Sequence, residues 1–313
     1  MKDKDYIPQG VRIHEILEFL DQNEYTYSFA GDSESFVFGF SSLTNYRPDT
    51  LTWIKNESAL KDSKGGLLHC VILPKPFDGI AVSNQITVKN PKEVFFAVLD
   101  HFWGDKETHY GIGEGSYIGE SVTLGRNVSV GRNCFIDGDI QIGDGTRIGN
   151  NVNIVNRVSI GSDCVIEHGT VIGIDGGGFS FDKDNIPHRV RHYGGVRIGD
   201  RVEIGCNCAV DRGTIDDTVI EDDVKITDLV QIGHNSVSGR GTIILSGAIL
   251  CGSAVVGEKC YIAPGAVVRN HTEIGDNSFV GLNAVTEKPA EANSMVFRNR
   301  DNHVRVPNYR KLL

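Results

Sequence analysis

The chain has 313 residues and a formal net charge of -10, enough for a small domain beside a longer repetitive one. A negative charge of this size opposes binding to the phosphates of nucleic acids, so no nucleic acid partner is expected. The N-terminus lacks the apolar stretch of a signal peptide, and no segment has the uninterrupted apolar run needed to cross a bilayer. We therefore expect a cytoplasmic protein without a transmembrane segment.

Residues 1–105 have the pattern of a separate α/β domain. Apolar residues recur at helical spacing over residues 13–20, whereas phenylalanines alternate over residues 36–40 as in a strand with one buried face. Residues 51–54 and 70–73 resemble further strands, and Asn90-Pro91 marks the start of a second helix.

From Ile118 onward an aliphatic residue recurs every six positions, and glycine follows it at most steps. The residues at this spacing are Ile118, Leu124, Val130, Ile136, Ile142, Ile148, Ile154, Ile160, Ile166 and Ile172, then Ile198, Ile204, Val210, Ile220, Ile226 and Ile232, and after Ser238 Ile244, Leu250, Val256, Ile262, Val268, Ile274 and Val280. One hexad cannot bury its aliphatic side chain alone, but stacked triangular coils can. The pattern therefore predicts that residues 106–287 form a mainly β domain, a parallel β-helix with these side chains as its core.

Two segments interrupt the repeat. The first, at about residues 173–196, is predicted to be a loop expelled from the coil, and because long loops are often functional we expect it to flank a substrate groove. Its glycines and histidines fit neither a dinucleotide nor a zinc motif, so no metal site is predicted. The second, between Val210 and Ile220, is a polar bulge, and residues 288–313 form a short C-terminal tail.

Six of the seven cysteines lie in the repeat region, where small thiols pack well in a core. The spacing of Cys206 and Cys208 lacks the two intervening residues usual in zinc and redox pairs. We predict reduced, buried thiols.

Two histidines are candidates for catalysis. His234 follows the inward Ile232 by two positions, so its side chain is expected on the surface of the prism, and His271 lies on a later coil. Histidine is the commonest general base, although an imidazole on a solenoid surface is often only solvated. The residues alone leave both interpretations open.

Four segments carry a family resemblance: residues 175–181 (DGGGFSF), 207–213 (NCAVDRG), 216–220 (DDTVI) and 231–235 (QIGHN). They resemble the UDP-3-O-acylglucosamine N-acyltransferases of lipid A biosynthesis, which are hexapeptide-repeat acyltransferases, and the likeness covers the N-terminal domain and nearly the whole repeat. It implies a left-handed parallel β-helix, a homotrimer, and active sites in grooves between neighbouring subunits.

The resemblance also implies roles for single residues. His234 matches the family's general base, Gly252 matches the glycine whose backbone N–H binds the oxyanion, and His271 matches a second histidine that assists binding or the tetrahedral intermediate. The implied reaction is attack by a sugar amine on an acyl thioester without an acyl-enzyme. No tightly bound cofactor is expected, because the donor carries the acyl group on the phosphopantetheine of acyl carrier protein or on CoA.

Substrate binding is implied at five residues. Trp53 and Asn56 stand where the family has an aromatic residue stacked on uracil and an asparagine beside it, and Asp228, Gln231 and Asn235 are predicted to contact the nucleotide amino sugar. For Trp53, burial in a strand is an equally good interpretation.

The chain departs from the family at three places. Ala59 replaces a tyrosine beside the base, Thr227-Asp228 replaces Asp-Asn, and the C-terminal helical extension is absent or reduced to the tail. A CoA-dependent enzyme that adds a short acyl group to a dTDP- or UDP-amino sugar therefore remains an alternative. A noncatalytic solenoid that binds a partner is a second alternative.

Overall fold

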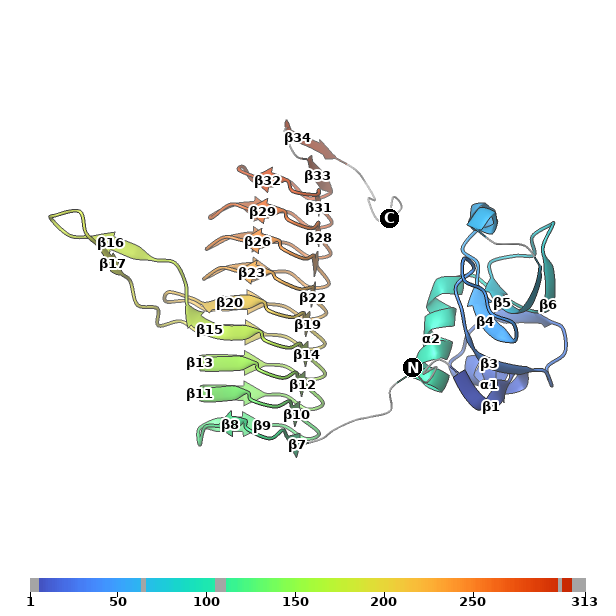
Figure 1. Cartoon of the computed structure of the whole chain (residues 1–313). Helices are drawn as coiled ribbons and strands as arrows, with labels where there is room; N and C mark the ends of the chain where they lie inside the picture. The colour runs from blue at the N-terminus through green and yellow to red at the C-terminus, as the bar shows by residue number, and fades with distance from the viewer. Residues whose placement is uncertain (1–5, 63–65, 105–110, 298–299, 306–313) are drawn as a thin grey trace. The chain divides into compact units, whose positions relative to one another are not determined.

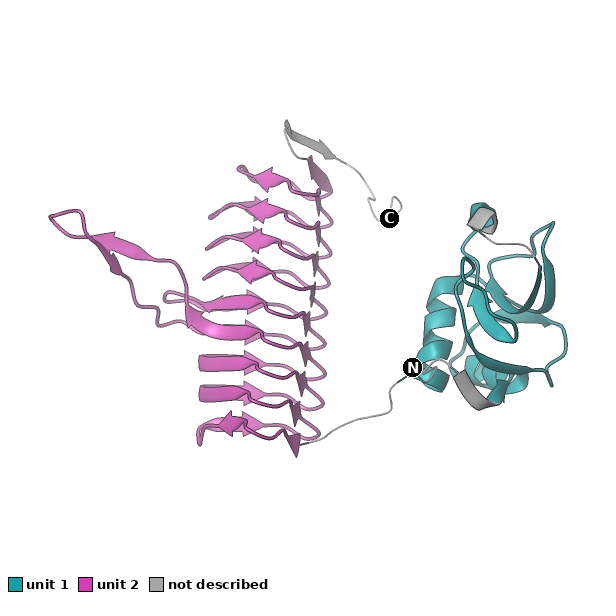
Figure 2. Ribbon diagram, viewed as in Figure 1, with its two compact units in different colours: residues 1–107 teal, residues 108–313 magenta. Residues whose placement is uncertain are grey.

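The computed structural model describes residues 6–62, 66–104, 111–297 and 300–305. The chain divides into two compact units, residues 1–107 and 108–313 (Figure 2). Neither of the two described helices is long and apolar enough to cross a membrane.

The first unit is a six-stranded mixed sheet with two helices. Its elements are β1 (Tyr6–Arg12), α1 (Ile13–Gln22), β2 (Tyr27–Ala30), β3 (Phe36–Phe40), β4 (Thr50–Trp53), the 3-10 helix η1 (Glu57–Asp62), β5 (Leu67–Leu73), β6 (Ala81–Val88) and α2 (Pro91–Trp103). The strand order is β1-β3-β4-β5-β6-β2, with parallel pairing in the centre and antiparallel pairing at both edges. Both predicted helices are present, and their apolar faces share one core with the sheet.

The second unit is a parallel β-helix of stacked three-sided coils (Figure 1). One face consists of β7 (Gly111–Ile112), β10 (Ser129–Val130), β12 (Arg147–Ile148), β14 (Val165–Ile166), β19 (Glu203–Ile204), β22 (Lys225–Ile226), β25 (Ile243–Ile244), β28 (Tyr261–Ile262), β31 (Phe279–Val280) and β33 (Ser294–Phe297), with β34 (Arg300–Arg305) antiparallel at its end. A second face consists of β8 (Tyr117–Ile118), β15 (Val171–Asp175), β20 (Ala209–Arg212), β23 (Gln231–Ile232), β26 (Ile249–Leu250), β29 (Val267–Val268) and β32 (Val285–Thr286). The third face consists of β9 (Val122–Leu124), β18 (Val196–Ile198), β21 (Thr218–Ile220), β24 (Val237–Ser238), β27 (Val255–Val256) and β30 (Glu273–Ile274). The long strands β11 (Phe135–Ile142) and β13 (Asn153–Ile160) join the second and third faces into one sheet.

The predicted aliphatic column forms the core of this unit. Every residue of the hexad series from Val130 to Val280 is buried in one cluster, and Ile118 and Leu124 pack against its end. Each buried Val, Leu or Ile contributes roughly 1.5 to 3 kcal/mol, so the column is the main source of stability. The prediction of a β-helix with this core is confirmed.

The cysteines of the repeat share positions with serine and threonine. Cys164, for example, follows Thr146 by one coil and receives no disulfide partner; its thiol donates to the carbonyl of Gly199 at 3.1 Å. All seven cysteines are free, and five are buried as predicted, whereas Cys206 and Cys251 are only half-buried. Burial raises the pKa of the Cys70 thiol to about 12.

Hydrogen bonds from backbone to side chain connect the corners of successive coils, and we call this set of side chains the corner ladder. At several corners a polar side chain accepts the backbone N–H of the residue one coil earlier, as Asp144 does from Arg126 at 2.8 Å and Asn150 from Arg132 at 2.7 Å. The next residue at many corners has positive φ, most often asparagine, which tolerates this conformation better than most side chains.

The first interruption is more ordered than a loop. β15 continues to Asp175, and β16 (Phe179–Phe181) pairs antiparallel with β17 (Pro187–Arg189) in a hairpin that projects from the stack (Figure 1). The end of the repeat also differs from the prediction: β33 pairs parallel with β31, and Val296 is buried, so the sheet continues past Glu287. Within the tail, residues 298–299 and 306–313 lie outside the described residues.

Candidate active site

His234 lies at the corner that follows β23, half-buried beside two glycines. The inward Ile232 fixes the strand, and the turn begins at Gly233. Nδ1 of His234 lies 3.1 Å from Oδ1 of Asn235. Because an amide oxygen only accepts, Nδ1 carries the hydrogen and Nε2 keeps a free lone pair, which is the form that a general base needs.

Asn235 is held at every polar atom of its side chain. Its Oδ1 also accepts from the backbone N–H of Thr214 at 3.0 Å and the hydroxyl of Thr214 at 2.8 Å, and its Nδ2 donates to the carbonyl of Asp216 at 2.8 Å. Asn235 was predicted to bind the amino sugar. Within the chain, these hydrogen bonds fix the amide of Asn235 against Nδ1 of His234.

Gly252 lies directly against the imidazole of His234, one coil on. A methyl carbon built on Gly252 would lie 2.5 Å from Nε2 and 2.6 Å from Cε1 of that ring. Glycine is therefore required for the ring to occupy this position. It also interrupts the corner ladder, since it has no side chain to accept the N–H of His234.

The backbone N–H of Gly252 is unpaired among the described residues, while its carbonyl accepts from the N–H of His271 at 3.3 Å. An unpaired N–H next to the lone pair of an imidazole combines a donor for a developing oxyanion with a proton acceptor. The fold thus brings together His234 and Gly252, two of the residues named by the family motifs.

The buried carboxylate of Asp211, in β20, lies near the imidazole of His234. A methyl carbon built on Gly176 would lie 2.8 Å from Oδ2 of Asp211 and 3.0 Å from Cδ2 of His234, so the two side chains are close neighbours across this glycine. Gln231, predicted to contact substrate, donates its Nε2 to Oδ2 of Asp211 at 3.0 Å. Burial raises the pKa of the Asp211 carboxyl, against the opposing effects of the Gln231 hydrogen bond and of His234, His192 and Arg189.

Replacing Asp211 with asparagine is expected to raise the melting temperature at neutral pH. A carboxyl whose pKa is raised in the fold destabilises the fold when it is ionised, and this cost disappears as the pH falls through the raised pKa towards 3.8. Thermal unfolding of Asp211→Asn and the parent chain from pH 7 to pH 4 should therefore show a difference that narrows with acidity. A variant that is less stable at pH 7 would contradict this account.

Two other predicted site residues lie elsewhere. Oδ1 of Asp228 accepts the backbone N–H of Cys206 at 2.7 Å, so Asp228 belongs to the corner ladder. His271 is exposed at a corner with φ of 55°, in the same column as Asn235 and Ser253. It stands two coils beyond Asn235, about 10 Å along the stack at roughly 4.8 Å per coil.

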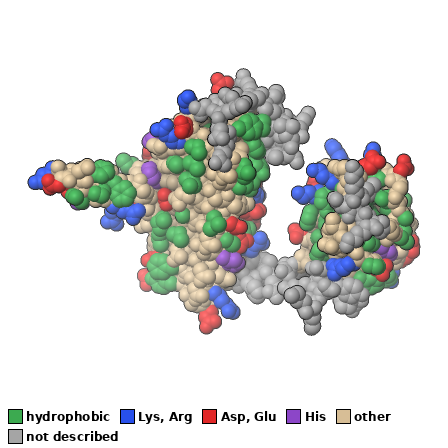
Figure 3. Space-filling view, turned by 45° about the horizontal axis from the view of Figure 1, so that its top comes forward, with side chains coloured by type: hydrophobic (Ala, Val, Ile, Leu, Met, Phe, Trp, Pro, Cys, Tyr) green, Lys and Arg blue, Asp and Glu red, His purple; other side chains and the backbone are tan. Residues whose placement is uncertain are grey.

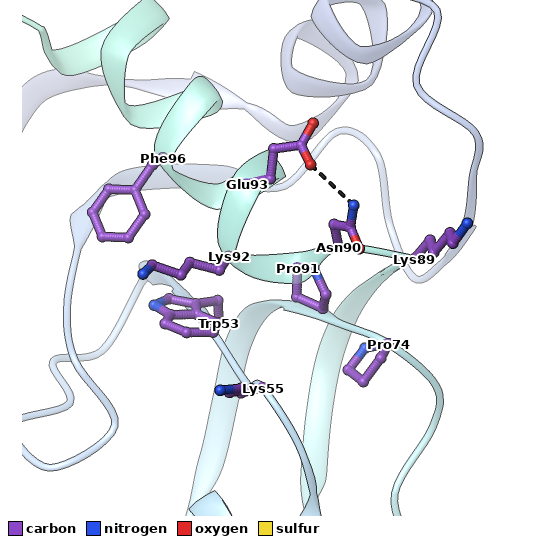
Figure 4. A pocket seen from close by; sticks show the side chains of 9 residues that line it. All are labelled: Trp53, Lys55, Pro74, Lys89, Asn90, Pro91, Lys92, Glu93 and Phe96. Carbon is purple, nitrogen blue, oxygen red and sulfur yellow. Dashed lines mark hydrogen bonds between the residues drawn. The ribbon is translucent and has the colours of Figure 1, made fainter. Parts of the chain in front are cut away.

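The first unit has a pocket of about 600 Å³ beneath the first turn of α2 (Figure 4). Its lining residues are Trp53, Lys55, Pro74, Lys89, Asn90, Pro91, Lys92, Glu93 and Phe96. Trp53 is half-buried, and its ring lies 6.3 Å from that of Phe95 in the core. Trp53 therefore lies partly against the core and partly in the pocket.

Asn56, predicted to lie beside the base, does not line this pocket. Its Oδ1 accepts from the hydroxyl of Ser58 at 2.7 Å and from the backbone N–H of Ala59 at 3.2 Å. Such bonds are typical of a residue that caps the start of a short helix, here η1. Three lysines and the N-terminus of α2 supply polar groups at this largely apolar pocket.

Two residues beside His234, Asp211 and His192, were not predicted from the sequence to belong to the site. Asp211 is part of the NCAVDRG segment, so its motif was visible but its role was not. His192 lies in the interruption, in a stretch that the spacing marked only as a charged loop. Its ring centroid is 5.1 Å from that of His234.

Comparisons with known proteins agree with this architecture. Residues 139–173 and 253–288 match the family model described as bacterial transferase hexapeptide (six repeats). A search of curated protein sequences found no significant match.

Solved structures with a similar fold include three acyltransferases. The UDP-N-acetylglucosamine acyltransferase of Francisella novicida has 21% identity and a TM-score of 0.58, with 64% of this chain and 71% of that chain covered. The UDP-N-acetylglucosamine O-acyltransferase of Moraxella catarrhalis has 23% identity and a TM-score of 0.56, with coverage of 62% and 73%. The UDP-N-acetylglucosamine acyltransferase of Campylobacter jejuni has 18% identity and a TM-score of 0.58, with coverage of 65% and 78%. The chain thus carries bacterial transferase hexapeptide repeats, folded into a parallel β-helix similar to those of these acyltransferases.

Proposed function

We propose that the protein is an N-acyltransferase that moves an acyl group from a thioester to the amino group of a nucleotide-linked amino sugar. The observation that carries this proposal is the juxtaposition of the free Nε2 lone pair of His234 with the unpaired N–H of Gly252. The motif resemblance to the N-acyltransferases of lipid A biosynthesis supports the choice of an amine.

The reaction follows from these two groups. Nε2 of His234 removes a proton from the sugar amine as the nitrogen attacks the thioester carbonyl, and the N–H of Gly252 stabilises the oxyanion. Collapse of the tetrahedral intermediate breaks the carbon–sulfur bond, and the thiolate takes the proton from His234. Asn235 holds Nδ1 throughout, so that Nε2 stays the reacting nitrogen.

One assay tests the acyl donor and the sugar acceptor together. Purified protein is incubated with acyl carrier protein and CoA thioesters of short and long acyl groups, each with UDP- and dTDP-linked amino and hydroxy sugars. Mass spectrometry detects the product, and hydroxylamine distinguishes an ester, which it cleaves, from an amide. Amide formation supports the proposal, and the preferred pair separates the lipid A type of reaction from short-chain transfer by CoA.

An ester product would favour O-acyl transfer, the activity for which the Moraxella catarrhalis relative is named. Absence of any transfer, together with binding of a protein partner, would favour the noncatalytic solenoid.

We also propose a homotrimer, with the hairpin β16–β17 at the contact between copies. Phe179, Phe181 and Tyr193 of this region are 58%, 64% and 70% exposed, and hydrophobic side chains line the projecting arm in Figure 3. An isolated two-stranded hairpin is marginal in water, so a neighbouring surface is expected to stabilise it. Light scattering should give three times the chain mass of 34.2 kDa.

The pocket at Trp53 is our candidate for the nucleotide of the acceptor. Replacing Trp53 with alanine is expected to raise KM for the nucleotide sugar by about 5- to 150-fold, since stacking of a base on an aromatic ring is worth about 1 to 3 kcal/mol. Because the ring does not take part in the chemistry, kcat should change little.

Steady-state kinetics of Trp53→Ala measures this effect, with Trp53→Phe as the control that keeps an aromatic face. Quenching of tryptophan fluorescence by UDP and dTDP gives an independent measure of binding in the parent chain. An unchanged KM in Trp53→Ala would remove this pocket from the proposal.

A further inference from the structure

His192 is a second imidazole beside His234 that the predicted reaction does not use. It lies three residues after β17, where the chain returns from the hairpin to the coil, and its side chain is fully buried. The two rings meet edge to face, with centroids 5.1 Å apart and an interplanar angle of 73°. Gly178 comes close to the same ring, since a methyl carbon built there would lie 3.4 Å from Cε1.

The tautomer of His192 follows from its one hydrogen bond. Nδ1 lies 3.1 Å from the carbonyl of Val190, and a carbonyl only accepts, so Nδ1 carries the hydrogen of the neutral ring. Nε2 is then an acceptor. It is buried and has no hydrogen-bond partner among the described residues, an arrangement that is rare and costly in folded proteins.

The charged groups around this ring come from several elements. Asp211 belongs to β20, Asp175 to β15 and Arg189 to β17, and Oδ2 of Asp175 accepts the backbone N–H of His192 at 3.4 Å. Arg189 donates to the carbonyl of Gly176 at 3.3 Å. His234 and His192 each lower the pKa of the Asp211 carboxyl, so the three side chains interact electrostatically.

We propose that His192 is a positioning residue for His234, an inference that rests on the proposed role of His234 as the base. While His234 is neutral, the lone pair on Nε2 of His192 has no hydrogen-bond partner among the described residues. When His234 takes the proton of the nucleophile, that lone pair and the carboxylate of Asp211 stabilise the new cation. The stabilisation exists only after proton transfer, so it lowers the barrier and leaves substrate binding unchanged.

Three variants separate the two nitrogens of His192. Asparagine reaches the position of Nδ1 and can keep the bond to Val190, glutamine reaches the position of Nε2, and phenylalanine keeps only the ring. We expect His192→Asn and His192→Phe to lower kcat about tenfold to a hundredfold with KM unchanged, as for other partners of a functional imidazole, and His192→Gln to recover most of the loss. Full kcat in His192→Asn or His192→Phe, or a change confined to KM, would overturn the proposal.

A second measurement does not depend on turnover. The Cε1–H NMR signal of His234, assigned with His234→Gln, is followed from pH 5 to pH 9 in the intact chain and in His192→Phe. Loss of a group that stabilises the cation should move the titration midpoint of His234 down by about half a pH unit or more. An unmoved midpoint refutes the inference even if amide formation is found, whereas a shift without any acyl transfer supports the coupling of the two imidazoles and rejects the proposed function alone.

Discussion

Replacing His234 with alanine is expected to lower kcat by about a hundred- to ten-thousand-fold, the usual contribution of a positioned general base. The fold should survive. His234 is a half-buried corner residue outside the aliphatic column, and its only side-chain hydrogen bond among the described residues is to Asn235. We therefore expect the free energy of unfolding to change by no more than about 1 kcal/mol.

Kinetics, thermal unfolding and light scattering on the same preparation test this expectation. The matched control is His271→Asn, since asparagine tolerates the positive φ of that exposed corner. The control should lose less activity than His234→Ala. Full turnover in His234→Ala would exclude base catalysis by this residue, and dissociation or unfolding would mean that the loss of activity does not report on chemistry.

The β-helix could be predicted because its stability depends on a local, periodic pattern. Each coil buries one aliphatic residue per face, so the positions of the core follow directly from the hexads. Even the exception at Ser238 keeps the register, since that side chain is buried in the same column position. No comparable rule applies to the first interruption, where the pairing of Phe179 with Arg189 breaks the period of six.

The candidate site was predictable only where a motif named a residue. The family motifs named His234 and Gly252, and the repeat places these two residues one coil apart. The carboxylate of Asp228 serves the corner ladder, and a ladder residue and a ligand-binding residue look alike in a sequence. His192 lies in the first interruption of the repeat and Asp211 in the second. Their distance from His234 therefore depends on how far each interruption departs from the coil.

In the first unit, too, spacing in the sequence does not determine which residues lie together. Trp53 and Asn56 are close in sequence, yet a strand end separates their roles: Trp53 closes β4 and reaches the pocket, whereas Asn56 caps η1. Spacing alone does not tell which way the chain turns after a strand. Lys55 is more than thirty positions from Lys89 and Lys92, and these three lysines of the pocket lining meet only in the fold.

Replacing Gly252 with alanine is expected to lower kcat by at least about a hundredfold, comparable to the loss of an oxyanion donor. The added methyl would lie 2.5 Å from Nε2 of His234, so the ring must move away. Movement of the ring breaks the bond between Nδ1 and Asn235, and the base and the N–H of residue 252 no longer face the same reacting carbonyl. The backbone itself is no obstacle, because φ of Gly252 is outside the positive region.

A double-mutant cycle separates this steric effect from general destabilisation. Gly252→Ala alone should be less stable than the parent chain, whereas Gly252→Ala combined with His234→Ala should recover that stability, because the clashing ring is gone. Gly177→Ala is the matched control, since a methyl carbon there meets nothing within 4 Å. If Gly252→Ala keeps wild-type kcat, the imidazole can work from another position. The close contact between His234 and Gly252 is then incidental to catalysis, and the pairing of base and oxyanion donor has to be abandoned.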